Sequence, residues 1–155
     1  MTKAESYLQH WHAHRDVLFD LLKAVDEQHV NFQPWAGAMS FADLIWHIVS
    51  TGYFFADSAA LGHASTRPQK PDLATIGAIE SSISEWTQKT HDRIASITDE
   101  QFANLVDLTQ LFGAKLPVAA LLQTNLDHEI HHKGQLFVYA RLCGADPLPF
   151  FVQRG

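Results

Sequence analysis

The sequence predicts an all-α protein, a four-helix bundle with one long crossover connection. Apolar residues recur at three- and four-residue steps in four long segments, which is the period of an amphipathic helix. No stretch alternates apolar and polar residues in the way that a half-buried strand does. A chain of 155 residues is also long enough to bury a complete core, so a single domain over residues 1–155 is expected.

The first helix is expected to run for about 20 residues and to end near Asp26, because apolar residues from Leu8 to Val25 keep the helical spacing. One face of this helix should therefore pack in the core. The following connection, residues 31–40, contains proline and small residues, which is typical of a loop.

The second helix is expected over residues 41–61. Ser40 has the side chain of a helix N-cap, and Gly62 can adopt the left-handed conformation that ends a helix. Residues 63–71 contain two prolines among polar residues, so they are expected to form the crossover to the third helix.

The third helix is expected over residues 73–97, with Asp72 as its cap. Residues 98–101 have the form of a capping box, Thr-Asp-Glu-Gln, which predicts a short helix at that point. Residues 105–114 show no regular pattern and are expected to be irregular.

Composition excludes several classes of partner. The 11 Lys and Arg against 17 Asp and Glu give a formal charge of −6 without a basic stripe, so nucleic acid is not expected. No apolar run approaches the roughly 20 residues that cross a bilayer, so no membrane partner is expected. A single cysteine, Cys143, and no recognisable secretory leader favour a cytoplasmic location, with Cys143 as a packed apolar side chain.

The last helix, expected over residues 116–142 and ending at Gly144, carries two histidines with the spacing of metal ligands. His128 and His132 are four residues apart, which places their imidazoles on one face, one turn apart. His131 is also close to His128 in sequence, but it points about 100° away from His132. We therefore prefer His132 as the second ligand.

A third ligand has to come from a facing helix, because two histidines leave a metal site incomplete. His47 is the best candidate, since it lies among apolar residues where an imidazole needs a polar partner. Two further residues are candidates for catalysis: Gln135 can hydrogen-bond a ligand or a bound water, and Glu129 can act as a base. Gly134 would let another backbone approach closely.

Two other histidine patterns occur in the sequence. Residues 128–132 match H-E-x-x-H, the motif of zincin proteases, but no His or Glu follows His132 to complete that site, and no strand is predicted to align a peptide. Near the start, His10, His12 and His14 alternate. His10 and His14 share a helical face and are a candidate second metal pair, although solvation at the surface is expected, and His14 lies close enough to the apolar stripe to line a pocket.

A histidine in an apolar second helix, followed some eighty residues later by His-x-x-x-His-x-x-Gln, resembles the DinB-like (damage-inducible) family. The resemblance spans nearly the whole chain and also includes Ser40 and Leu105. It implies a four-helix bundle, often dimeric, with a divalent metal bound by His47, His128 and His132. Several members of this family are thiol-dependent transferases or isomerases.

Three neutral imidazoles leave a divalent ion its full charge and open positions, so an anionic oxygen or sulfur ligand is expected to bind it. Zinc or nickel is the expected metal, followed by iron or manganese. The predicted function is a metal-dependent hydrolase or low-molecular-weight thiol transferase, acting as a homodimer on a small molecule. The alternative is a non-catalytic metal-binding stress protein or dimeric interaction module.

Overall fold

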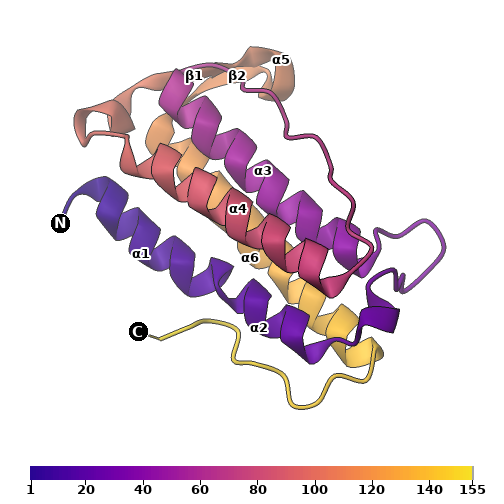
Figure 1. Cartoon of the computed structure of the whole chain (residues 1–155). Coiled ribbons are helices and arrows are strands. Elements are labelled where there is room, and N and C mark those ends of the chain that lie inside the picture. Colours follow the sequence, from indigo (N-terminus) through magenta and orange to yellow (C-terminus); the bar gives the residue numbers. More distant parts are fainter. Residues whose placement is uncertain (155) are drawn as a thin grey trace.

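The computed structural model of the protein describes residues 1–154 and consists of long helices packed side by side (Figure 1). Helix α1 (Lys3–Arg15) continues into α2 (Val17–Ala24), and this pair lies beside α4 (Ile76–Ala95). Helix α3 (Phe41–Leu61) packs against both α4 and α6 (Val118–Leu142). The predicted all-α bundle is confirmed, with α1 and α2 together as its first member. In the described part of the chain, no helix is both long and apolar enough to cross a membrane.

The first predicted helix is interrupted at Asp16. Helix α1 ends one residue before it and α2 begins one residue after it, so the prediction of one continuous helix is wrong at this point. The apolar stripe runs through the break without a change of face: Leu8 and Trp11 are buried before it, and Leu18 and Leu22 after it. Periodicity therefore carried no signal of the interruption. A short 3₁₀ turn, η1 (Glu27–His29), leads from α2 into the loop.

Both predicted ends of α3 are confirmed. The Ser40 hydroxyl accepts a hydrogen bond of 3.0 Å from the backbone N–H of Asp43, and Gly62 has a φ of 84°. The crossover after Gly62 contains no helix, as expected, but it extends to Thr75, whose hydroxyl caps α4. The prediction of Asp72 as the cap is wrong, because its carboxylate accepts from the backbone N–H two residues later, within the loop.

A small hairpin stands between α4 and α6, where an irregular segment was expected. The predicted capping box is confirmed by reciprocal bonds between Thr98 and Gln101, and the helix after it is the 3₁₀ turn η2 (Glu100–Ala103). Strands β1 (Leu105–Leu108) and β2 (Ala114–Pro117) then pair antiparallel around the short helix α5 (Thr109–Phe112). Four-residue strands are too short to show a clear alternation in sequence. Because 114–117 are paired, α6 begins at Val118, two residues later than predicted.

The core consists of two apolar clusters, one at each end of the bundle, with a buried ion pair between them. Arg15 is fully buried and contacts Glu129 of α6 through two hydrogen bonds of 2.7 and 2.8 Å. Trp11 also donates to Glu129, and Thr87 of α4 accepts from Arg15. Since a buried charge is tolerated only with full pairing, these bonds fix how α1, α4 and α6 sit against one another.

Replacing glycine by alanine is expected to destabilise the protein at Gly52 and to stabilise it at Gly134. A Cβ on Gly52 would lie 2.8 Å from Nη2 of Arg15, which cannot move because Glu129 holds it, whereas a Cβ on Gly134 would meet nothing within 4 Å. The expectation that Gly134 permits a close backbone approach is thus wrong. Gly52→Ala should lower the free energy of unfolding by about 1–3 kcal/mol, and Gly134→Ala should raise it by about 1 kcal/mol. Urea denaturation of both variants checks this, and a stabilised Gly52→Ala protein would contradict it.

Candidate metal centre

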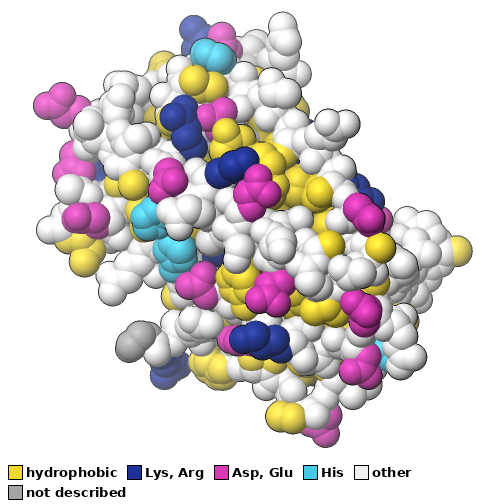
Figure 2. All heavy atoms as spheres, in the orientation of Figure 1, with side chains coloured by type: hydrophobic (Ala, Val, Ile, Leu, Met, Phe, Trp, Pro, Cys, Tyr) yellow, Lys and Arg dark blue, Asp and Glu magenta, His cyan; other side chains and the backbone are white. Residues whose placement is uncertain are grey.

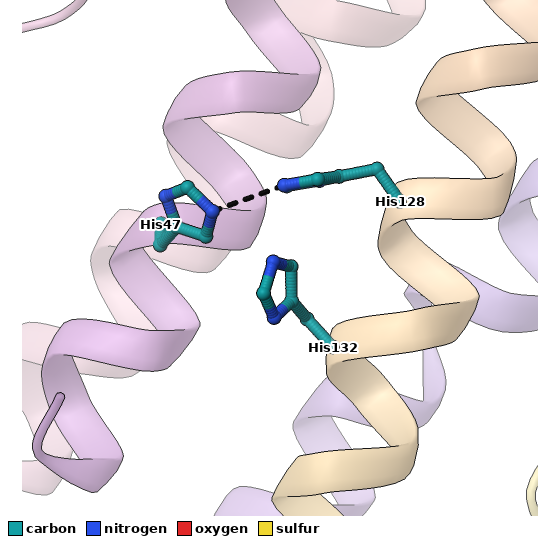
Figure 3. Close-up of side chains that lie close together, drawn as sticks. All are labelled: His47, His128 and His132. Carbon is teal, nitrogen blue, oxygen red and sulfur yellow. Dashed lines mark hydrogen bonds between the residues drawn. The ribbon is translucent and has the colours of Figure 1, made fainter. Parts of the chain in front are cut away.

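The three predicted ligands come together between α3 and α6. Figure 3 shows His47 on α3 facing His128 and His132, which lie one turn apart on α6. One ligand nitrogen from each residue lies within 4.8 Å of the others, and the Nε2 atoms of His47 and His128 are 3.0 Å apart. Among residues 1–154, no other group of three His, Cys, Asp or Glu side chains converges in this way.

The orientation of α6 is set by the residues that follow the two histidines. Glu129 comes directly after His128 and is held by Arg15, and Lys133 comes directly after His132. The Lys133 ammonium is buried, contacts Nδ1 of His14 at 2.7 Å and also donates to a backbone carbonyl near the C-terminus. Because neighbouring helical side chains diverge by about 100°, holding these two residues against α1 turns the histidines toward α3.

The environment keeps all three imidazoles neutral. Burial lowers the pKa of His128 to about 4, with smaller contributions from His132, His47, His131 and Arg67. Burial also lowers the pKa of His47 and of His132 below the ordinary value of 6.5. A neutral imidazole has the lone pair that a metal ion requires, so the three histidines could hold a metal ion at neutral pH.

The donor set fits a divalent transition metal. Zinc holds imidazole nitrogens at about 2.0–2.1 Å, which places two nitrogens of a tetrahedral site roughly 3.3 Å apart, close to the 3.0 Å between His47 and His128. The Nδ1 atom of His132 lies 2.7 Å from Oε1 of Gln135. This carbonyl can only accept, so Nδ1 of His132 carries the proton and Nε2 is left free as the ligand atom. Gln135 thus lies beside His132, and its role at a metal ion stays a prediction.

Two other residues near the pair on α6 do not join the group. Glu129 is 1 % exposed and both of its oxygens are bonded to α1, so the structure does not bring this candidate base to the three histidines. His131 is exposed, and its ring contacts only that of His132 within the cluster, at 4.7 Å between centroids. Sequence reasoning also missed Arg67, which lies in the crossover and whose charge acts on both His47 and His128. A loop arginine gives no periodic signal.

The N-terminal histidines form different contacts from those predicted. Of the two alternatives for His14, surface solvation is wrong, because its ring is buried near the apolar stripe and contacts Lys133. The His10 and His14 rings are 5.3 Å apart between centroids, and His12 pairs with His91 of α4, with 2.9 Å between Nε2 of His12 and Nδ1 of His91. Histidine side chains accordingly reach the surface where α1 and α4 meet (Figure 2). The candidate metal pair of His10 and His14 is therefore not supported.

Acid should destabilise the metal-free protein through these imidazoles. Because their pKa values are lower in the folded chain than in the unfolded chain, the unfolded chain binds more protons below pH 6.5. The contribution of these imidazoles to the free energy of unfolding should be fully present above pH 6.5. It should decrease as the pH falls toward about 4, the pKa of His128. Urea denaturation at several pH values measures the loss, which should be smaller in His128→Leu. An equal loss in this variant would contradict the assignment.

Gln135 should strengthen metal binding through His132. Gln135→Leu keeps the size of the side chain but removes the acceptor for Nδ1 of His132, so metal affinity should fall by about 10–100-fold. The matched control is Gln123→Leu, because Gln123 lies on the same helix and bonds only to Asp127. Competition with a chelator measures both variants, and equal affinities would show that Gln135 does not orient the ligand.

Comparison with known proteins places residues 1–154 in a single protein family. The sequence model of the DinB family matches residues 1–154. The Bacillus subtilis (strain 168) protein YjoA, described only as uncharacterized, is 35 % identical over 154 residues, which cover 99 % of this chain and 99 % of that protein.

Two crystal structures have a similar fold. The DinB-like protein YjoA from Bacillus subtilis superposes with a TM-score of 0.85 at 32 % identity, covering 96 % of this chain and 99 % of that chain. A DinB-like protein from Bacillus cereus ATCC 10987 gives a TM-score of 0.79 at 20 % identity, covering 94 % and 95 % of the two chains, and shows the fold alone. The resemblance inferred from the sequence is confirmed, and the chain belongs to the DinB family.

Proposed function

We propose that the protein is a metal-dependent enzyme that binds one divalent ion through His47, His128 and His132 and acts on a small molecule. The observation that carries this proposal is the convergence of three neutral imidazoles without a fourth protein ligand among residues 1–154. Structural zinc sites are closed by four protein ligands, whereas catalytic sites keep a position open. The three-ligand set therefore supports catalysis over a purely structural role.

The ion would act as a Lewis acid that lowers the pKa of a water or thiol in its open position. The neutral ligand set matters here, because carboxylate or thiolate ligands would cancel part of the charge of the ion. Zinc and nickel are the metals that we propose first, since both accept imidazole and thiolate ligands.

For a thiol substrate, the proposed reaction is a transfer. The thiol releases its proton to solvent, its sulfur forms a bond to an electrophilic carbon, and the leaving group departs with the electrons of the broken bond. The chain contributes the rigid imidazole cluster, with Gln135 holding the His132 ring in one tautomer. Hydrolysis by water is the second reaction that the same open site would support. The predicted homodimer and cytoplasmic location stay predictions.

Turnover by the metal-loaded protein tests the proposal. Panels of thiols with alkylating or epoxide electrophiles, and of esters and amides, should reveal a reaction that His132→Ala abolishes and that His10→Ala leaves unchanged. His10 is an exposed histidine on α1 and is a suitable control for loss of an imidazole elsewhere. Metal-loaded protein without turnover on any panel, or with turnover that survives in His132→Ala, would favour the non-catalytic metal-binding alternative.

A further inference from the structure

The crossover between α3 and α4 passes along the face of α3 that carries His47. Its Lys70 pairs with Asp43, and its Arg67 donates a hydrogen bond of 3.3 Å to the hydroxyl of Thr51. Asp43 and Thr51 lie one turn before and one turn after His47, so all three share one helix face. In Figure 1 the segment between α3 and α4 runs beside α3 for most of its length. The crossover therefore borders the metal centre.

Arg67 is the cation of this segment that has no acidic partner. Its side chain is exposed, and no carboxylate of residues 1–154 lies within ion-pair distance of it. The acidic residues on this side of α3 are already paired, Asp43 with Lys70 and Asp57 with Arg93. An arginine presents a planar set of donors that suits carboxylate and phosphate groups, and among residues 1–154 only the hydroxyl of Thr51 accepts from this one.

The guanidinium is nevertheless held in a defined place. Its central carbon lies 4.9 Å from the centre of the Phe54 ring, and the bond to Thr51 fixes its other side. An ordered arginine loses less side-chain freedom when it binds an anion than a fully mobile one does. Thr51 lies one turn after His47 on the same face of α3, so this bond places the guanidinium beside His47. A ligand in the open position of the metal would thus lie within reach of Arg67.

We propose that Arg67 forms an oxyanion subsite beside the metal centre, and that the substrate is a small molecule with a carboxylate or phosphate group in addition to the group that binds the metal. This inference rests on the proposed function, because the metal supplies the first point of attachment. It deepens that function by naming the chemistry of the substrate. The whole protein is acidic, with a formal charge of −6, so a local cationic subsite is needed to offset the general repulsion of an anion.

Two thiols of similar length, one with a terminal carboxylate and one with an uncharged terminal hydroxyl, test the subsite. The protein is loaded with cobalt, and the sulfur-to-cobalt charge-transfer band is titrated with 3-mercaptopropionate and with uncharged 3-mercaptopropanol. We expect 3-mercaptopropionate to bind more tightly, and Arg67→Gln to weaken it by about 10-fold, as expected for one charge-assisted bond at an exposed site. Binding of 3-mercaptopropanol should stay unchanged.

Lys70→Gln is the matched control. It removes one positive charge from the same segment, but that charge is already paired with Asp43. It should change the affinity for 3-mercaptopropionate by less than about 2-fold, since exposed charges are screened. An equal loss in both variants would show a general charge effect, and an unchanged affinity in Arg67→Gln would show no subsite. Either result overturns the inference while leaving the proposed thiol binding intact.

Calorimetric binding of inorganic phosphate to the cobalt protein separates the two claims. Phosphate has no thiol, and its affinity should also fall by about 10-fold in Arg67→Gln if the subsite exists. If no thiol gives a charge-transfer band, the thiol-transfer proposal fails, and the phosphate result alone decides on Arg67. Phosphate binding that is equal in the native protein and in Arg67→Gln would then reject the subsite.

Discussion

His132→Ala is expected to weaken binding of a divalent metal by at least about 100-fold. Metal sites of four ligands have apparent binding free energies of about 10–16 kcal/mol, which is roughly 3 kcal/mol for each ligand. Removing one of three ligands should therefore cost at least this much, because the remaining two, His47 and His128, cannot hold the ion alone. Competition with a chromophoric chelator at neutral pH measures the change in affinity.

The control for this experiment is His131→Ala. His131 is the residue before His132 on α6, and its exposed ring lies 4.7 Å from that of His132 without belonging to the converging group. Its replacement should change metal affinity by only a small factor. If His131→Ala lost as much metal affinity as His132→Ala, His131 would have to be considered as the ligand that accompanies His128.

Arg15→Ala is expected to lower the free energy of unfolding by about 3–5 kcal/mol, because it leaves the carboxylate of Glu129 buried without its partner. For a domain of this size, such a loss corresponds to a decrease in Tm of roughly 6–20 °C. Differential scanning calorimetry of the metal-free protein measures it. Metal affinity should fall as well, since Glu129 sets the rotation of α6 and hence the direction of His128.

A double variant distinguishes an unpaired charge from simple loss of packing. Arg15→Met combined with Glu129→Leu removes both charges while keeping the volume, so it should be more stable than Arg15→Ala alone. Lys70→Ala breaks an exposed ion pair and should cost less than about 1 kcal/mol. A double variant as unstable as Arg15→Ala would show that the cost comes from lost contacts and not from the buried carboxylate.

The helices and the histidine cluster could be predicted from the sequence because both depend on periodicity. Spacing of four residues fixed His128 and His132 on one face, and the apolar neighbours of His47 placed it on a helix that faces the core. The caps at Ser40 and Gly62 were also predictable, since each residue type has a specific conformational or hydrogen-bonding reason to end a helix.

The features that the sequence could not predict depend on contacts between distant residues. Glu129 matched the base of a protease motif, and only the fold shows that Arg15, 114 positions earlier, binds it. The strands of the hairpin are only four residues long, which is too short for a clear alternation of apolar and polar residues. They are strands because they pair with each other. Arg67 lies in a loop, where no period places it beside the helix face of His47.

The central claim is that His47, His128 and His132 bind one ion together. Elemental analysis of untagged protein, purified without a metal resin and loaded with excess zinc before desalting, tests it most directly beside His47→Ala treated in the same way. The account predicts about one zinc per chain in the native protein and little in the variant. Equal zinc in both proteins, or none in the native protein, would contradict a site built from these imidazoles.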